Sequence, residues 1–77
     1  MLRRDYFKCM ELHKILKERI KGGIFVTISN GTLAINIRGG RGVNYTKNIN
    51  DISTRIENIA DEIEYDYRKF VISKFLY

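Results

Sequence analysis

The sequence predicts a small α+β domain, α-β-β-β-α in chain order, in which two helices pack on one face of a small antiparallel sheet. Apolar residues recur at the helical period of 3.6 near both ends of the chain, and β-branched residues alternate around an Asn-Gly pair between them. A chain of 77 residues corresponds to one domain, 1–77. This is close to the size at which a single core just offsets chain entropy.

The first element is a helix over residues 2–21. Gly22-Gly23 ends it, and Arg19 and Lys21 in its last turn suit the negative end of the helix dipole. Phe7 and Ile15 project from its charged side. The apolar stripe expected to face the core consists of Leu2, Tyr6, Cys9, Leu12, Leu16 and Ile20.

Two strands follow, over residues 24–29 and 32–38. Asn30-Gly31 stands between them and suits the two left-handed positions of a type I′ hairpin turn. Phe25 points away from the face expected to be buried, which comprises Ile24, Val26, Ile28, Leu33, Ile35 and Ile37. After a glycine-rich loop, residues 43–47 form a short third strand.

The last element is a helix over residues 51–75, with a break near Asn58 left open. Asn48, Asn50, Asp51, or Thr54 together with Glu57 in the capping-box spacing, are its candidate caps.

In residues 70–77 the apolar side chains point all round the helix, more than a domain of this size covers. Such surface usually marks an interface, so we expect a protein partner or a second copy, with Ile72, Phe75, Leu76 and Phe7 as anchors. The alternatives are a last turn that frays or packs beneath the sheet, and weaker contact with a membrane surface.

The net charge of +5 is unevenly distributed. Residues 1–49 carry a net charge of +7, and residues 50–77 carry −2. Glu57, Asp61 and Glu64 share one side of the last helix, and we expect them to steer a basic partner or to form a solvated face. A catalytic role for them is disfavoured because no histidine lies nearby.

Nucleic-acid binding is the alternative function. The stretch IRGGRGVNY combines arginine charge with glycine flexibility, and Tyr45 could stack on a base. Equally, its glycines suit a flexible connection between strands. The loop leads into a strand and not a helix, which argues against a phosphate cradle. The candidate nucleic-acid residues are Arg3, Arg4, Lys8, Arg38, Arg41, Tyr45 and Lys47.

Cys9 and His13 stand four residues apart on one helical face, the spacing of a thiolate and its base or of two metal ligands. Two ligands do not close a zinc site, so a buried thiol and a hydrogen-bonded histidine are favoured. We expect no enzyme activity, cofactor or metal. The charged N-terminus lacks the apolar stretch of a signal peptide or membrane span, and together with the single cysteine it indicates the cytoplasm, here of a bacterial host cell.

The stretches NDIS and IADEIEYDYRKFVISKFLY, within the last 30 or so residues, resemble small proteins common in phages and prophages of low-GC Gram-positive bacteria. The resemblance implies an accessory role, such as binding and inhibiting a host or defence protein. Some anti-CRISPR proteins share the α-β-β-β-α order. Double-stranded-RNA-binding domains share it too, but they place a lysine cluster at the start of the last helix, where residues 50–55 here read Asn-Asp-Ile-Ser-Thr-Arg.

Overall fold

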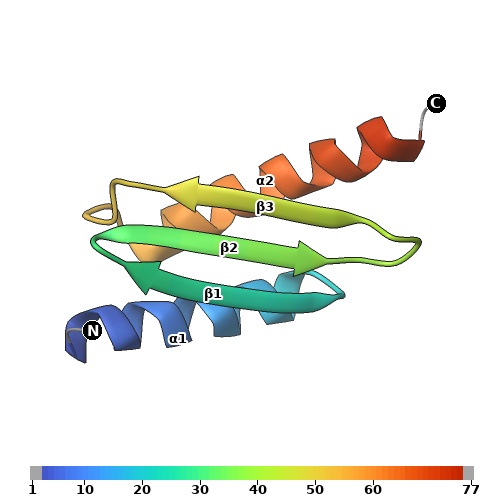
Figure 1. The fold of residues 1–77 in the computed structure, drawn as a ribbon. Coiled ribbons are helices and arrows are strands. Elements are labelled where there is room, and N and C mark those ends of the chain that lie inside the picture. The colour runs from blue at the N-terminus through green and yellow to red at the C-terminus, as the bar shows by residue number, and fades with distance from the viewer. Residues whose placement is uncertain (1–2, 76–77) are drawn as a thin grey trace.

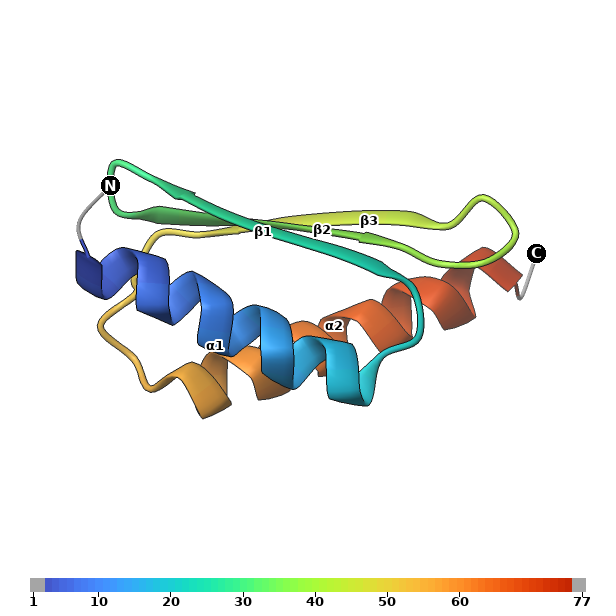
Figure 2. The ribbon, with the colours of Figure 1, turned by 90° about the horizontal axis from the view of Figure 1, so that it is seen from below.

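The predicted α-β-β-β-α order is confirmed by a computed structural model, which describes residues 3–75 (Figure 1). Both helices pack on the same face of the sheet, and the other face is open to solvent (Figure 2). The elements are α1 (Arg3–Arg19), β1 (Gly23–Ser29), β2 (Thr32–Arg38), β3 (Asn44–Ile49) and α2 (Ile56–Phe75).

The three strands form an antiparallel meander in the order β1-β2-β3. Asn30 and Gly31 both have positive φ, 51° and 76°, as the predicted type I′ turn requires. The register pairs Val26 with Ile35, and Ile35 with Lys47. The central strand β2 is thus paired on both sides, whereas β1 and β3 each have one free edge.

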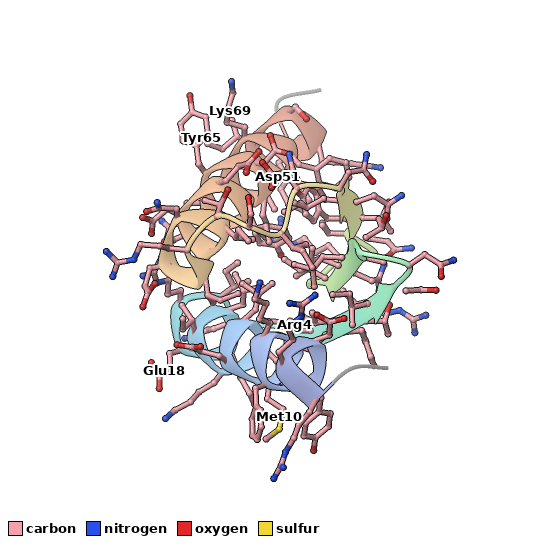
Figure 3. All side chains as sticks on the ribbon, turned by 90° about the vertical axis from the view of Figure 1, so that its left-hand side faces the viewer. Arg4, Met10, Glu18, Asp51, Tyr65 and Lys69 are labelled. Atoms are coloured by element: carbon pink, nitrogen blue, oxygen red, sulfur yellow. The ribbon has the colours of Figure 1, made fainter. Side chains whose placement is uncertain are left out.

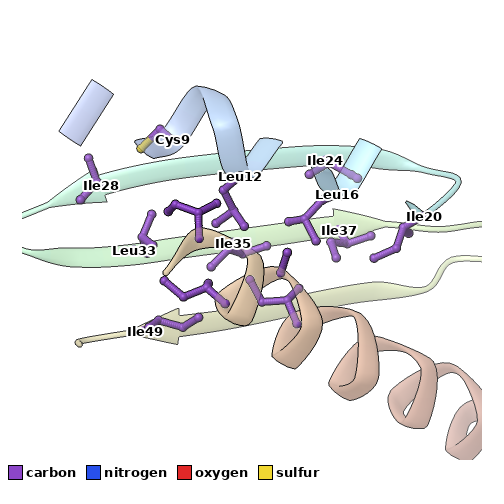
Figure 4. Packing of buried hydrophobic residues seen from close by; sticks show 14 of the residues in the cluster. Cys9, Leu12, Leu16, Ile20, Ile24, Ile28, Leu33, Ile35, Ile37 and Ile49 are labelled. Carbon is purple, nitrogen blue, oxygen red and sulfur yellow. The ribbon is translucent and has the colours of Figure 1, made fainter. Parts of the chain in front are cut away.

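The core lies between the sheet and the helices, where apolar side chains of every element meet. Leu12 and Leu16 of α1 point towards Ile35 and Ile37 of β2, and all four are at most 2% exposed (Figure 4). Ile59 and Ile63 contribute the buried face of α2. The alternation predicted for β1 and β2 is therefore observed, and Phe25 lies on the open face, 53% exposed.

The second helix begins at Ile56, five residues later than the sequence predicts, and it continues past Asn58 without a break. The Asp51 carboxylate accepts hydrogen bonds from the backbone N–H and the hydroxyl of Ser53, at 3.1 and 2.6 Å. This local turn competes with helix formation. The Arg55 carbonyl then accepts the first helical bonds, so the helix begins after Arg55 and Thr54 is not its cap.

Two smaller boundaries also differ. The first helix ends at Arg19, because Gly22 takes a φ of +149° and turns the chain into β1. The third strand spans 44–49 in place of 43–47, since pairing with β2 continues to Ile49 opposite Leu33.

The molecule is elongated, with principal extents of 42 × 19 × 19 Å. When the sheet is viewed face-on, the N-terminal half of α1 lies beyond the free edge of β1, and the C-terminal part of α2 lies beyond the free edge of β3 (Figure 1). Within residues 3–75, neither helix has the length and apolarity that crossing a bilayer requires.

Candidate functional site

A hollow with a volume of about 740 Å³ lies between α1 and the free edge of β1. We call it the α1–β1 groove; its lining residues are Tyr6, Phe7, Cys9, Met10, Glu11, His13, Lys14, Val26 and Thr27. Tyr6, Phe7 and Met10 are each more than half exposed, and Met10 points away from the core (Figure 3). The groove therefore presents apolar side chains to solvent.

Sequence periodicity finds only part of this groove. Phe7 was expected to be exposed, but Tyr6 was placed on the core stripe, and that prediction is wrong because Tyr6 is 52% exposed. The buried stripe of α1 begins only at Cys9, which lies near Ile28 at the end of β1 (Figure 4). Met10 is not predicted as a groove residue from the sequence. The available signal is an apolar side chain directly after Cys9, which places it off the buried stripe.

His13 connects the groove to the backbone of β1. Its Nε2 lies 3.1 Å from the Ile24 carbonyl oxygen, and because a carbonyl only accepts, Nε2 is the donor. In an antiparallel strand the N–H and C=O of one residue point to the same side, and the side alternates along the strand. Ile24, Val26 and Ile28 therefore direct their backbone groups away from β2, towards the free edge.

Cys9 is a buried free thiol, as predicted. Burial is the main cause that raises its pKa, and the nearby Asp5 carboxylate adds to it. A raised pKa disfavours the nucleophilic thiolate. Within residues 3–75, no three His, Cys, Asp or Glu side chains are grouped so that they could hold a metal ion.

Apart from the groove, a polar cluster joins β3 to α2. The Tyr45 hydroxyl and the Lys47 ammonium both donate to Asp66 Oδ2, at 2.9 and 3.0 Å. We call these three residues the Asp66 cluster. Burial, followed by the contact with Asp66, raises the pKa of Tyr45, whereas the hydrogen bonds from Lys47 and then Tyr45 lower the pKa of Asp66.

The Asp66 cluster corrects two expectations about nucleic-acid binding. Tyr45 is only 4% exposed, and its ring meets those of Tyr67 and Phe70 edge to face, so neither ring face is open to a base. Lys47 faces the helices and is paired with Asp66, with Glu62 at 3.7 Å, instead of being free for phosphates. Strand alternation places Tyr45, Lys47 and Ile49 on one face, which is the signal that could have shown this.

The remaining basic candidates are dispersed. Lys8 donates to the Ile52 carbonyl at 2.9 Å, and the guanidinium groups of Arg38 and Arg41 lie over the rings of Phe25 and Phe75. Arg3 and Arg4 are exposed at the start of α1, which lies at the opposite end of the molecule from the β2–β3 loop (Figure 1). These residues do not form one basic face.

The predicted acidic side of α2 is largely paired within the molecule. Arg19 of α1 contacts both Asp61, at 2.5 Å, and Glu64, at 3.3 Å, and Arg68 also pairs with Glu64. Glu57 stands 3.8 Å from Arg55. Asp61 and Glu64 are thus paired with Arg19 across the two helices, which leaves less negative charge to attract a partner.

The predicted anchors near the C-terminus form a separate apolar surface. Ile72 and Phe75 are 57% and 49% exposed, and Leu76 lies outside the described residues. Phe75 also lines a small hollow of about 200 Å³ against the β2–β3 loop. There Gly39 packs so closely against the Tyr67 hydroxyl that a Cβ at this position would overlap it. The loop therefore packs on α2 as well as joining two strands.

Comparisons of the chain with family models, curated proteins and solved structures found no significant match. Function therefore has to be inferred from the surfaces themselves.

Proposed function

We propose that this chain is a non-enzymatic interaction protein that binds a partner protein in the α1–β1 groove and modulates or inhibits it. The observation that carries the proposal is the groove itself, where Tyr6, Phe7 and Met10 stand half-exposed around a hollow of about 740 Å³. Large apolar groups gathered around a concave surface are typical of binding sites. The resemblance of the last 30 residues to small phage proteins favours a host or defence protein as the partner.

Several features favour a protein over a nucleic acid. Lys47 is paired with Asp66, and Arg38 and Arg41 lie against aromatic rings. The exposed side chains of the groove are mainly apolar, and nucleic-acid surfaces are dominated by phosphate contacts from free Lys and Arg. Ile72 and Phe75 add a second apolar surface at the other end of the molecule.

The groove contributes useful but limited binding energy through side chains alone. Fully burying a Phe or Met contributes roughly 1.5–3 kcal/mol, so three half-exposed side chains contribute about 3 kcal/mol together. Association costs about 4–15 kcal/mol in lost freedom. A tight complex therefore needs contacts besides these three side chains.

Selection from a displayed library of short random peptides tests the proposal. Met10→Glu places a charge in the groove, and Tyr65→Glu is the matched control, because Tyr65 is also exposed but projects from α2 on the other side of the molecule (Figure 3). We expect the same peptides to be enriched on the wild type and on Tyr65→Glu, but not on Met10→Glu. Enrichment on none of the proteins, or equal enrichment on all three, would contradict the proposal.

A further inference from the structure

The β1 strand carries none of the usual residues that block a free strand edge, in contrast to β3. Proteins commonly block an exposed strand edge with a charge, a proline or an inward-pointing charged side chain. β3 has such a side chain in Lys47, which points towards the helices and pairs with Asp66. β1 reads Gly-Ile-Phe-Val-Thr-Ile-Ser and contains neither a charge nor a proline. Of the two edges, β1 is therefore the one open to another strand.

Backbone groups on this edge are available at defined positions. The strand directs the N–H and C=O of Ile24, Val26 and Ile28 away from β2. The Ile24 carbonyl already accepts a hydrogen bond from His13. An added strand would consequently pair with Val26 and Ile28, and these lie beside the part of α1 that carries Cys9 and Met10.

The α1 helix supplies a floor for such a strand. Its N-terminal half lies beyond β1 in the face-on view, so this half occupies the space beneath the next strand position (Figure 1). Tyr6, Phe7 and Met10 line this space together with Val26. Alternate side chains of an added strand would point down onto these apolar groups, which supplies the side-chain contacts that backbone pairing lacks.

We propose that β1 binds an extended segment of the partner protein as a fourth strand of the sheet, paired at Val26 and Ile28 and lying over Tyr6, Phe7 and Met10. This inference rests on the proposed function and states how the groove is filled. Recognition by strand addition gains affinity from main-chain hydrogen bonds and specificity from alternate side chains.

The charges around the groove favour a segment with acidic flanks. α1 carries six basic and three acidic residues. Two charged residues line the groove, Lys14 and Glu11, and among residues 3–75 Lys14 has no acid within ion-pair distance. The excess of positive charge comes from the rest of α1, outside the lining. An alternating apolar segment flanked by Glu or Asp therefore matches the floor and the rim of the groove.

A second copy of this chain fits the edge less well. Two β1 strands paired around a twofold axis would each bring their own α1 beneath the junction, because the N-terminal half of α1 lies beyond β1 (Figure 1). The two helices would then compete for the same space. An isolated extended segment brings no such helix.

The test uses the full chain and a synthetic peptide, Glu-Thr-Val-Thr-Val-Thr-Val-Glu, with fluorescence anisotropy as the binding assay. Two further peptides carry backbone N-methyl groups, one on the valines and the other on the threonines. Only alternate amides of an added strand pair with β1, so one methylated peptide should lose about tenfold or more in affinity and the other should bind like the parent.

Amide hydrogen exchange on the protein gives an independent readout. We expect the parent peptide to protect the Val26 and Ile28 amides and to leave those of Phe25 and Thr27 unchanged, since these already pair with β2. Val26→Lys, which imitates the inward charge of Lys47, should abolish binding, while Tyr65→Glu should bind normally.

Several results would overturn the inference. One is the absence of peptide binding to the wild type, and another is equal loss with both methylated peptides. Protection of Val26 and Ile28 in a peptide-free dimer detected by sedimentation would identify a second copy as the occupant. If library selection enriches groove-dependent peptides that do not protect these amides, the strand inference fails while the proposed function stands.

Discussion

Asp66→Asn should destabilise the protein measurably at neutral pH, because it removes the charge on which the Tyr45 and Lys47 hydrogen bonds converge. A hydrogen bond to a charged group contributes about 1.5–3 kcal/mol when it is buried. The Asp66 side chain is 46% exposed and that of Lys47 is 23% exposed, so solvent screening reduces this contribution. Since asparagine keeps a neutral acceptor, we expect the free energy of unfolding to fall by about 1–2 kcal/mol.

This loss is large enough to measure and too small to unfold the chain. Stabilities of about 0.05–0.15 kcal/mol per residue give about 4–12 kcal/mol for this length. Urea unfolding followed by circular dichroism at pH 7 is the assay, and a slope of about 1 kcal/mol per molar predicts a midpoint lower by roughly 1–2 M. Asp61→Asn is the matched control, with a smaller expected effect because its pair with Arg19 is more exposed.

The contribution of Asp66 to the free energy of unfolding should decrease at low pH. Lys47 and Tyr45 lower the pKa of Asp66 in the folded state. Its contribution is therefore fully present above the ordinary aspartate pKa of about 4, and it disappears as the pH falls through the lowered value. The stability difference between wild type and Asp66→Asn should be full at pH 7 and should narrow below about pH 4. A difference that is absent at pH 7, or that persists undiminished at low pH, would refute this reasoning.

Three further predictions concern the turn, the core and the buried tyrosine. Gly31→Ala should lower the free energy of unfolding in urea by about 1 kcal/mol, because the φ of Gly31 is +76°. Gly40→Ala is the control and should lower it little, since there is open space around Gly40. Equal losses in the two variants would contradict this prediction. Leu16→Ala should lower the free energy of unfolding by about 2–5 kcal/mol, because Leu16 is buried, and Phe7→Ala should lower it far less, because Phe7 is exposed. Similar decreases in the thermal unfolding midpoint of the two variants would refute this prediction. Because burial raises the pKa of Tyr45, stability should fall as the pH rises above about 10, and Tyr45→Phe should weaken that fall; unchanged alkaline unfolding would contradict this.

Local patterns predicted the elements of this fold because their causes are local. Asn30-Gly31 fixes the hairpin turn, and the alternation in β1 and β2 fixes which face is buried. The start of α2 was missed for an equally local reason, the turn that the Asp51 side chain makes with Ser53. Such a turn and a helix cap use the same residue types, so composition alone does not distinguish them.

The candidate site was harder to predict because it lies between elements. How far α1 extends beyond β1 depends on packing across the whole core, and no short stretch of sequence encodes this offset. Tyr6 continues the helical stripe, which predicts a core position, although its side chain is 52% exposed. Lys47 is a nucleic-acid candidate by sequence because its partner, Asp66, lies 19 residues away and no local pattern reveals the pair.

The length of the molecule gives the chain two separate apolar ends. The α1–β1 groove includes the first turns of α1, whereas Ile72 and Phe75 lie in the last turns of α2, at the opposite end of a body 42 Å long. A ligand seated in the groove leaves the far end uncovered. The two apolar surfaces therefore do not merge into a single binding site.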